Sequence, residues 1–171
     1  PDAENKFGLF LTEILRAEGV NCFHLATLAS LSAEVIGAYD VILLAETPLT
    51  ASQIEMFEGY VFNGGGLVSL KPAAGFESIF GWERNAGSLS DEYLLYDSAH
   101  PVNAGSNPLS LQYHGAADLY ALTGGEGLAW LFTKHAPYGK PAITMNQFGD
   151  GVAVAYAFDL AKSIAYMRQG N

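Results

Sequence analysis

The sequence predicts an α/β fold: a doubly wound, mostly parallel sheet, with antiparallel strands added in the C-terminal half. Three adjacent segments indicate it. Residues 40–45 (DVILLA) form a short, continuous apolar run, which is typical of a strand buried on both faces. Residues 50–62 have the pattern of a capped amphipathic helix, and residues 67–70 (LVSL) form a second apolar strand. A strand–helix–strand unit of this length forms a right-handed crossover between parallel strands.

The helix in this unit has local signals at both ends. Thr50 is followed three residues later by Gln53, as in a capping box, where each side chain bonds the backbone of the other. Four side chains at helical spacing give the helix one apolar face: Ile54, Phe57, Tyr60 and Val61. Glycines 64–66 end the helix, and Pro72, which has no amide hydrogen to donate, ends the strand that follows.

The first 38 residues extend the alternating pattern towards the N-terminus. Residues 5–18 predict a helix, residues 20–25 (VNCFHL) a short strand, and residues 31–38 a brief helix or turn. A helix this apolar that leads straight into a strand is expected to follow another strand. We therefore expect the first strand of the sheet to lie upstream of Pro1, and the chain to be a fragment of a longer protein.

The second half is expected to be mainly antiparallel. Asp150-Gly151 is a hairpin-turn signal between two apolar runs. Residues 82–90 are expected to form a loop, residues 75–80 a helical turn, and the segment from Asp159 or Leu160 to about residue 167 a final helix. The predicted strands cover residues 92–96, 109–113, 118–122, 127–132, 142–146 and 151–158.

Composition narrows the classes of partner. The 171 residues suit one domain with a substantial core. Eight basic and 18 acidic residues give a net charge of −10, which argues against nucleic acids and anionic membranes as partners. The single cysteine, Cys22, excludes an internal disulfide and a multi-cysteine zinc site, and we expect it to be a small core residue. Nothing in the sequence points to a compartment.

Five polar residues are the candidate site residues. Ligands of open parallel sheets bind beyond the carboxyl ends of the strands. The residues expected there are Glu46, Lys71 and Asp159, and His114 and Asp118 follow a neighbouring strand. They could bind a small polar ligand or carry out catalysis, but ion pairing among them is the interpretation we favour, because such networks also occur without function.

Motifs for cofactors, metals and nucleophilic catalysis are missing from the sequence. Glycines 64–66 follow a helix and precede a strand, the reverse of a phosphate-binding loop, and no histidine pair has metal-ligand spacing. A nucleophilic cysteine or serine would stand on a tight turn after a strand, with a histidine in reach. After residues 67–70 the chain instead reads Lys71-Pro72-Ala73-Ala74. We therefore predict no cofactor and no metal, and lean away from an enzyme.

Residues 39–72 (YDVILLAETPLTASQIEMFEGYVFNGGGLVSLKP) resemble the class I glutamine amidotransferase-like domains, including the trehalose-utilisation-like and β-galactosidase trimerisation branches. A YDVIVL strand and a helix ending in a YV..GGGLV phrase recur there. Three further segments resemble uncharacterised bacterial multidomain proteins: KFGLFLTEILRAEGVNCF, LQYHGAADLYAL and AYAFDLAKSIAYMRQGN. The resemblance covers nearly the whole chain. It implies a flavodoxin-like sheet, a strand before Pro1 and further sequence after Asn171.

The resemblance does not extend to the chemistry of the family. True amidotransferases carry a Gly-x-Cys-x-Gly elbow after the strand equivalent to residues 67–70, where this chain has residues 70–74 (LKPAA). We therefore expect a non-catalytic module of a larger bacterial protein that contacts neighbouring domains or binds a small polar ligand. The alternative is a hydrolase of carbohydrates or amides that uses the five candidate residues. A homo-oligomer also remains open.

Overall fold

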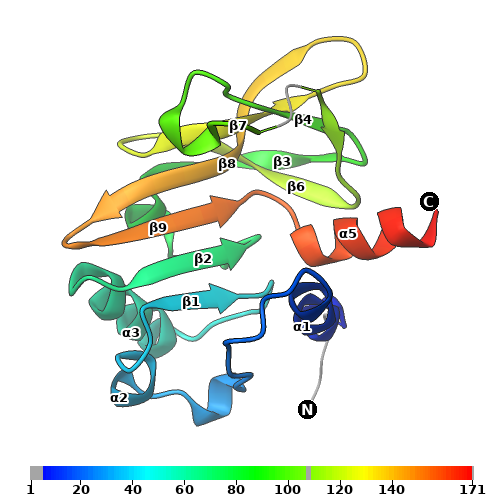
Figure 1. Ribbon diagram of the computed structural model, residues 1–171. Helices are drawn as coiled ribbons and strands as arrows, with labels where there is room; N and C mark the ends of the chain where they lie inside the picture. The colour runs from blue at the N-terminus through cyan, green and yellow to red at the C-terminus, as the bar shows by residue number, and fades with distance from the viewer. Residues whose placement is uncertain (1–5, 107–108, 171) are drawn as a thin grey trace.

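The computed structural model describes residues 6–106 and 109–170 of the chain (Figure 1). Its helices are α1 (Phe7–Ala17), η1 (Leu28–Ser30), α2 (Ala33–Ile36), α3 (Ala51–Phe62), α4 (Glu77–Phe80), η2 (Pro101–Asn103) and α5 (Leu160–Gln169). Its strands are β1 (Val41–Leu44), β2 (Gly66–Leu70), β3 (Trp82–Ser90), β4 (Tyr93–Tyr96), β5 (Leu111–Gln112), β6 (Ala116–Leu122), β7 (Glu126–Phe132), β8 (Pro137–Phe148) and β9 (Gly151–Tyr156).

Seven strands form one sheet in the order β1-β2-β9-β8-β7-β4-β5, and β3 and β6 pair separately. Strands β1, β2 and β9 run parallel, whereas every pairing from β9 to β5 is antiparallel. The α/β class and the division into a parallel first half and antiparallel second-half strands are therefore confirmed. The crossover between β1 and β2 is confirmed too, and Thr50 and Gln53 form the predicted capping box at the start of α3.

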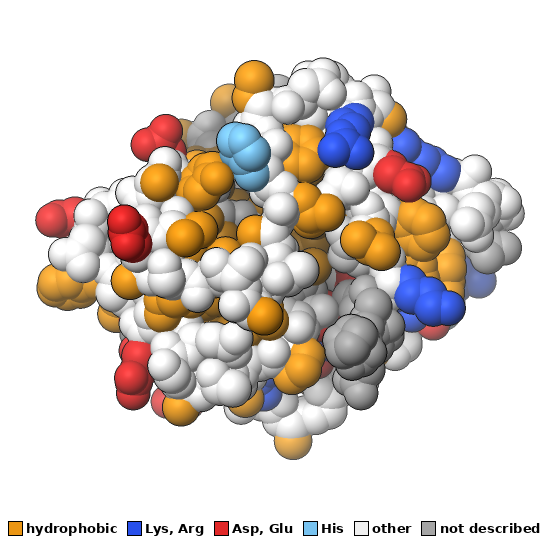
Figure 2. Space-filling model, turned by 90° about the horizontal axis from the view of Figure 1, so that it is seen from below, with side chains coloured by type: hydrophobic (Ala, Val, Ile, Leu, Met, Phe, Trp, Pro, Cys, Tyr) orange, Lys and Arg blue, Asp and Glu red, His pale blue; other side chains and the backbone are white. Residues whose placement is uncertain are grey.

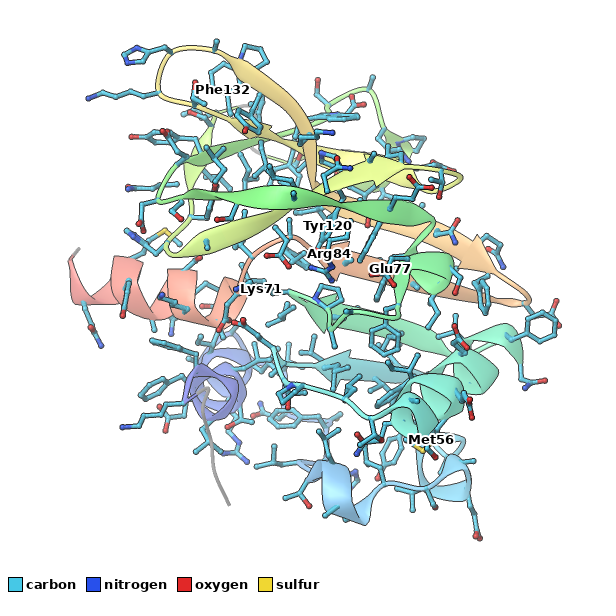
Figure 3. The ribbon with its side chains drawn as sticks, turned by 180° about the vertical axis from the view of Figure 1, so that it is seen from behind. Met56, Lys71, Glu77, Arg84, Tyr120 and Phe132 are labelled. Atoms are coloured by element: carbon cyan, nitrogen blue, oxygen red, sulfur yellow. The ribbon has the colours of Figure 1, made fainter. Side chains whose placement is uncertain are left out.

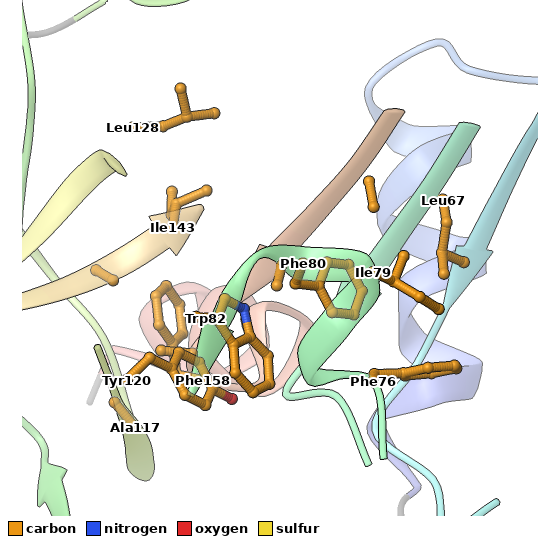
Figure 4. Packing of buried hydrophobic residues seen from close by; sticks show 14 of the residues in the cluster. Leu67, Phe76, Ile79, Phe80, Trp82, Ala117, Tyr120, Leu128, Ile143 and Phe158 are labelled. Atoms are coloured by element: carbon orange, nitrogen blue, oxygen red, sulfur yellow. The ribbon is translucent and has the colours of Figure 1, made fainter. Parts of the chain in front are cut away.

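Helices cover both faces of the parallel part of the sheet. On one face, Phe57 and Val61 of α3 belong to the main core. Phe80 of α4 and Leu67 of β2 belong to the same core (Figure 4). On the other face, a smaller cluster joins α1 and α5 to the sheet through Leu11, Ile14, Leu70 and Ala161. Because α1 and α5 are held on Leu70, the last residue of β2, the turn that follows β2 lies at a well-packed point of the fold.

The expectation that residues 82–90 form a loop is wrong, because they form β3 and pair with β6. Trp82 anchors the strand: its ring stacks on Tyr120 at 3.9 Å between centroids and on Phe80 at 5.8 Å. Polar residues follow Trp82 without the alternation of a half-buried strand, so the pattern hid the pairing. The stacked rings tie α4 to the two-stranded sheet.

Three expectations for the N-terminal region are also corrected. Residues 20–25 are not a strand, and Cys22 is exposed rather than in the core. Strand β1 is buried on one face only, since the side chains of Val41 and Leu43 are 59% and 39% exposed. All three differences have one physical reason: β1 is the edge of the sheet, and residues 20–25 have no ladder partner among the described residues.

Replacing Phe76 should test the aromatic core. Its ring is fully buried, with ring centroids 6.1 Å from Phe57 and 5.7 Å from Phe80. We expect Phe76→Ala to lower the free energy of unfolding by about 3–5 kcal/mol, because it removes apolar contacts and leaves a cavity. The partly exposed Phe10 is the matched control, and Phe10→Ala should cost less than about 1 kcal/mol. Urea denaturation measures both values, and equal losses would contradict this assignment of the core.

Candidate functional site

Two of the five candidate residues form an ion pair at the carboxyl ends of β1 and β2. Lys71 directly follows β2, and its Nζ lies 2.9 Å from Oε1 of Glu46, which follows β1. Both side chains are partly exposed. The ion pair therefore bridges the ends of the two strands. Because both charges are partly exposed to solvent, their attraction contributes at most about 1 kcal/mol to stability.

The backbone at Lys71 is unusual. Its φ angle is 48°, in the left-handed region that costs a residue with a Cβ roughly 1 kcal/mol. Its amide donates a hydrogen bond of 2.9 Å to the carbonyl oxygen of Tyr156 in β9. The chain thus makes a sharp turn directly after β2, held by the neighbouring strand; Figure 3 labels Lys71 at this turn. The turn brings the Lys71 side chain to Glu46.

Arg84 in β3 organises the region next to this turn (Figure 3). Its Nη1 binds the carboxylate of Asp118 in β6, and its Nη2 donates a 2.9 Å hydrogen bond to the carbonyl oxygen of Pro72. Its Nε lies 3.6 Å from Oε1 of Glu77. The guanidinium carbon also lies over the ring of Tyr120, 5.4 Å from the centroid. Three polar contacts and the ring of Tyr120 therefore hold Arg84 in place, and its hydrogen bond to Pro72 links the turn after β2 to the second sheet.

His114 and Asp159 both contact α5. Asp159 is the N-cap of α5: its carboxylate accepts the amide hydrogen of Lys162 at 3.1 Å, and the residue is only 5% exposed. The His114 amide donates to Oγ of Ser163 at 3.0 Å, and its Nδ1 lies 3.8 Å from Oδ1 of Asp91. Both residues have contacts that hold α5 in place.

The structure thus gathers the candidate residues in two groups. Glu46 pairs with Lys71, and Asp118 joins the same turn through Arg84, whereas His114 and Asp159 hold α5. Arg84 is the residue that sequence reasoning missed, because it falls in a segment expected to be a loop. None of the five lines the hollow of about 320 Å³ beside β1 or the one of about 540 Å³ beside α3.

Burial strongly raises the pKa of three phenol groups, those of Tyr113, Tyr120 and Tyr156. Burial, with a smaller effect from Tyr96, raises the pKa of Tyr156 to about 12. Burial also raises the pKa of Tyr120, to which the negative charge of Asp118 adds, and that of Tyr113, to which Glu92 adds. These hydroxyl groups stay protonated near neutral pH, so they can donate hydrogen bonds but cannot serve as bases.

Across residues 6–106 and 109–170, no group of three or more histidine, cysteine, aspartate or glutamate side chains is arranged to hold a metal ion. In the same part of the chain, the helices are too short or too polar to cross a bilayer.

No protein-family model and no curated protein sequence matches the chain. Solved structures share its fold at low sequence identity. A cytoplasmic protein from Salmonella typhimurium LT2 is 13% identical, with a TM-score of 0.69, and the match covers 88% of this chain and 75% of that one. A ThuA-like protein from Bacteroides uniformis is 18% identical, with a TM-score of 0.59 and coverages of 89% and 73%.

A β-galactosidase from Rahnella sp. R3 also shares the fold. It is 18% identical with a TM-score of 0.59, and the match covers 78% of this chain but only 23% of that enzyme. The chain therefore spans about a quarter of the length of this β-galactosidase. The similarity to a ThuA-like protein and to glycosidase domains is a similarity of fold, since identities this low carry no information about activity.

The three polar contacts of Arg84 predict that replacing it lowers the stability of the protein more than replacing an exposed arginine does. We expect Arg84→Met to lower the free energy of unfolding by about 1.5–3 kcal/mol, because it strips charged hydrogen bonds from partly buried groups. Arg168→Met is the matched control, because Arg168 pairs with Glu18 in an exposed position, and it should cost at most about 1 kcal/mol. Chemical denaturation of both variants decides the question, and a larger loss for Arg168→Met would refute the assignment.

Alkaline titration should reveal the buried phenol of Tyr156. Its pKa is raised on folding, so the unfolded chain loses the proton near pH 10 while the folded chain keeps it to about pH 12. The stabilising contribution is complete below pH 10 and is lost as pH rises towards 12. We expect Tyr156→Phe to make the decline in stability over this range shallower, measured by urea denaturation at several pH values. An unchanged slope would contradict the pKa assignment.

Proposed function

We propose that this chain is a non-catalytic module with an amidotransferase-like fold inside a larger bacterial protein, where it serves contacts between domains. The observation that carries the proposal is the residue after β2. An amidotransferase would place its nucleophilic cysteine on this turn, and here Lys71 occupies it in the left-handed conformation. A left-handed residue thus stands at the position where the amidotransferases carry their nucleophile, with a side chain of different chemistry.

The Lys71–Glu46 ion pair supports a structural role for that side chain. Nζ of Lys71 lies 2.9 Å from a carboxylate oxygen of Glu46, so this side chain is held in an ion pair with a neighbouring residue. Arg84 in turn donates hydrogen bonds to the carboxylate of Asp118 and to the carbonyl oxygen of Pro72. These groups satisfy one another, so they do not need a ligand to be stable.

The comparisons support the idea of a module within a larger protein. In the Rahnella β-galactosidase the matching region makes up 23% of the enzyme's chain, so this fold can form one part of a much larger protein. A carbohydrate-active parent protein is one setting consistent with that similarity. In such a protein the module would provide a contact surface for other domains rather than catalytic residues.

A hydrolase acting on a carbohydrate or amide substrate is the second candidate. Two observations favour it. Backbone strain such as that at Lys71 is often found at functional sites, and Nε2 of His114 is buried without a hydrogen-bond partner. In this alternative, Glu46, Lys71 and Asp118 would exchange their ion pairs for contacts with substrate.

The two functions are separated by a hydrolysis assay on the purified chain. The substrates are a panel of nitrophenyl glycosides, glutamine and simple amides, with nitrophenol or ammonia release as the readout. We expect no turnover above the buffer rate, and no change on Lys71→Ala or Glu46→Ala. Turnover that falls at least tenfold in Lys71→Ala but not in the control Lys134→Ala would overturn the non-catalytic proposal in favour of the hydrolase.

A further inference from the structure

The sheet ends at β1 in an apolar edge. Among the described residues β1 pairs only with β2, so one side of the strand has no ladder partner. Val41 and Leu43 in this strand are apolar and exposed. Natural proteins protect such an edge with charges, with proline or with a covering segment, and β1 itself carries neither a charge nor a proline. A covering segment is therefore the form of protection that suits this strand.

A hollow of about 320 Å³ lies beside this edge, and we call it the β1 groove. Its lining residues come from β1, from residues 22–26, from α1 and from η1, among others. Figure 2, which views the molecule from the β1 side, shows hydrophobic side chains gathered around a hollow in this face. Apolar surface that faces water in this way is unfavourable, so a movement that closes the groove is stabilising.

Residues 21–26 are an extended segment without backbone partners, and we call them the strap. They belong to no helix or strand, and in the described part of the chain their backbone groups make no hydrogen bond. Hydrogen bonds hold the chain on both sides of the strap. The amide of Val20 donates to the carbonyl oxygen of Leu15 at 2.8 Å, and that of Ser30 to the carbonyl oxygen of Thr27 at 3.0 Å.

The strap is long enough to lie along β1. Its six residues span up to about 20 Å when extended, whereas the four residues of β1 span about 13 Å. The strap already touches the start of β1, because the ring of His24 contacts the ring of Tyr39 at 5.7 Å between centroids. Since the strap itself lines the β1 groove, its inward movement removes the hollow and gives both unpaired backbones a partner.

One weak contact ties the strap to α1. The guanidinium carbon of Arg16, in the last turn of α1, lies over the ring of Phe23, 5.4 Å from the centroid. Arg16 is exposed and forms no ion pair with any other described residue. A cation–π contact at an exposed site contributes little, so it opens easily and sets Phe23 free to turn towards β1.

We propose that residues 21–26 are a strap that closes on the outer edge of β1, and that the contact between Arg16 and Phe23 holds it in the open position of the structure. In the closed position the strap pairs with β1 and covers Val41 and Leu43. The strap thereby keeps β1 from pairing with a strand of another molecule until it opens. This inference concerns a different part of the molecule from the Lys71 turn and does not depend on the proposed function.

Disulfide trapping in the 171-residue chain tests the closure. Cys22, in the strap, is exposed and is the only cysteine of the sequence. Val41→Cys adds a second thiol on β1, and Val102→Cys in η2 is the matched control, because the two valines are 59% and 60% exposed. A disulfide forms only when its two Cα atoms come within about 7 Å, so it traps the strap against β1.

The reaction is followed in a glutathione redox buffer by mass spectrometry of the linked peptides. We expect the disulfide within one molecule to form at least about tenfold faster in Val41→Cys than in Val102→Cys, because only β1 lies within reach of the closed strap. Both substitutions fall on exposed side chains, and circular dichroism checks that both variants fold.

Adding Arg16→Ala to Val41→Cys tests the contact that holds the strap open. Loss of this contact should speed the trapping by at least about threefold, because nothing then retains Phe23 on α1. Arg168→Ala is the matched control. Arg168 is also an exposed arginine in the last turn of a helix, but it pairs with Glu18, so its replacement should leave the trapping rate unchanged.

Three results would overturn the inference. The first is trapping in Val41→Cys that is no faster than in Val102→Cys. The second is an equal effect of Arg16→Ala and Arg168→Ala on the trapping rate. The third is a disulfide-linked dimer whose yield grows with protein concentration, because a second copy rather than the strap would then cover β1. None of these results bears on the hydrolysis assay of the Lys71 region, so failure here and failure of the proposed function are distinguishable.

Discussion

The pairing of β9 with its neighbours on both sides is the interaction on which the rest of the structure depends. β9 binds β2 in parallel and β8 antiparallel, so it joins the two halves of the sheet. Just beyond it, the carbonyl oxygen of Ala157 accepts the amide hydrogen of Asp118, which attaches the second sheet. Ala153, Ala155 and Ala157 are almost completely buried, and their small side chains let the aromatic residues of α4 approach this strand closely.

The carboxyl ends of β2 and β9 show how a turn of this kind can be held without a nucleophile. The amide of Lys71 is fixed by β9, its side chain by Glu46, and the next carbonyl group, that of Pro72, by Arg84. Each contact is modest by itself, but together they hold a left-handed residue that would otherwise relax. A site built in this way gains rigidity from the contacts among its charges.

Features encoded by neighbouring residues could be predicted from the sequence, and features that depend on distant partners could not. The capping box of Thr50 and Gln53 spans four residues, and the structure forms it as expected. β3 owes its existence to pairing with β6, more than 25 residues later, and Arg84 contacts Asp118, 34 residues away. The sequence placed Asp159 near the strand ends but did not distinguish a ligand-binding carboxylate from a helix cap. Residues 20–25 show the opposite error, because their composition favours a strand that finds no partner among the described residues.

The long separation between β2 and β9 also shapes how the protein is made. Gly66 faces Val152 in the ladder, so the parallel half cannot close until the residues of β9 have left the ribosome. Until then β1 and β2 can form only a two-stranded apolar piece with α3, which is not stable by itself. Pairings this distant slow folding and expose strand edges to other nascent chains. Strand β2 is therefore expected to present an unpaired edge until β9 has been synthesised.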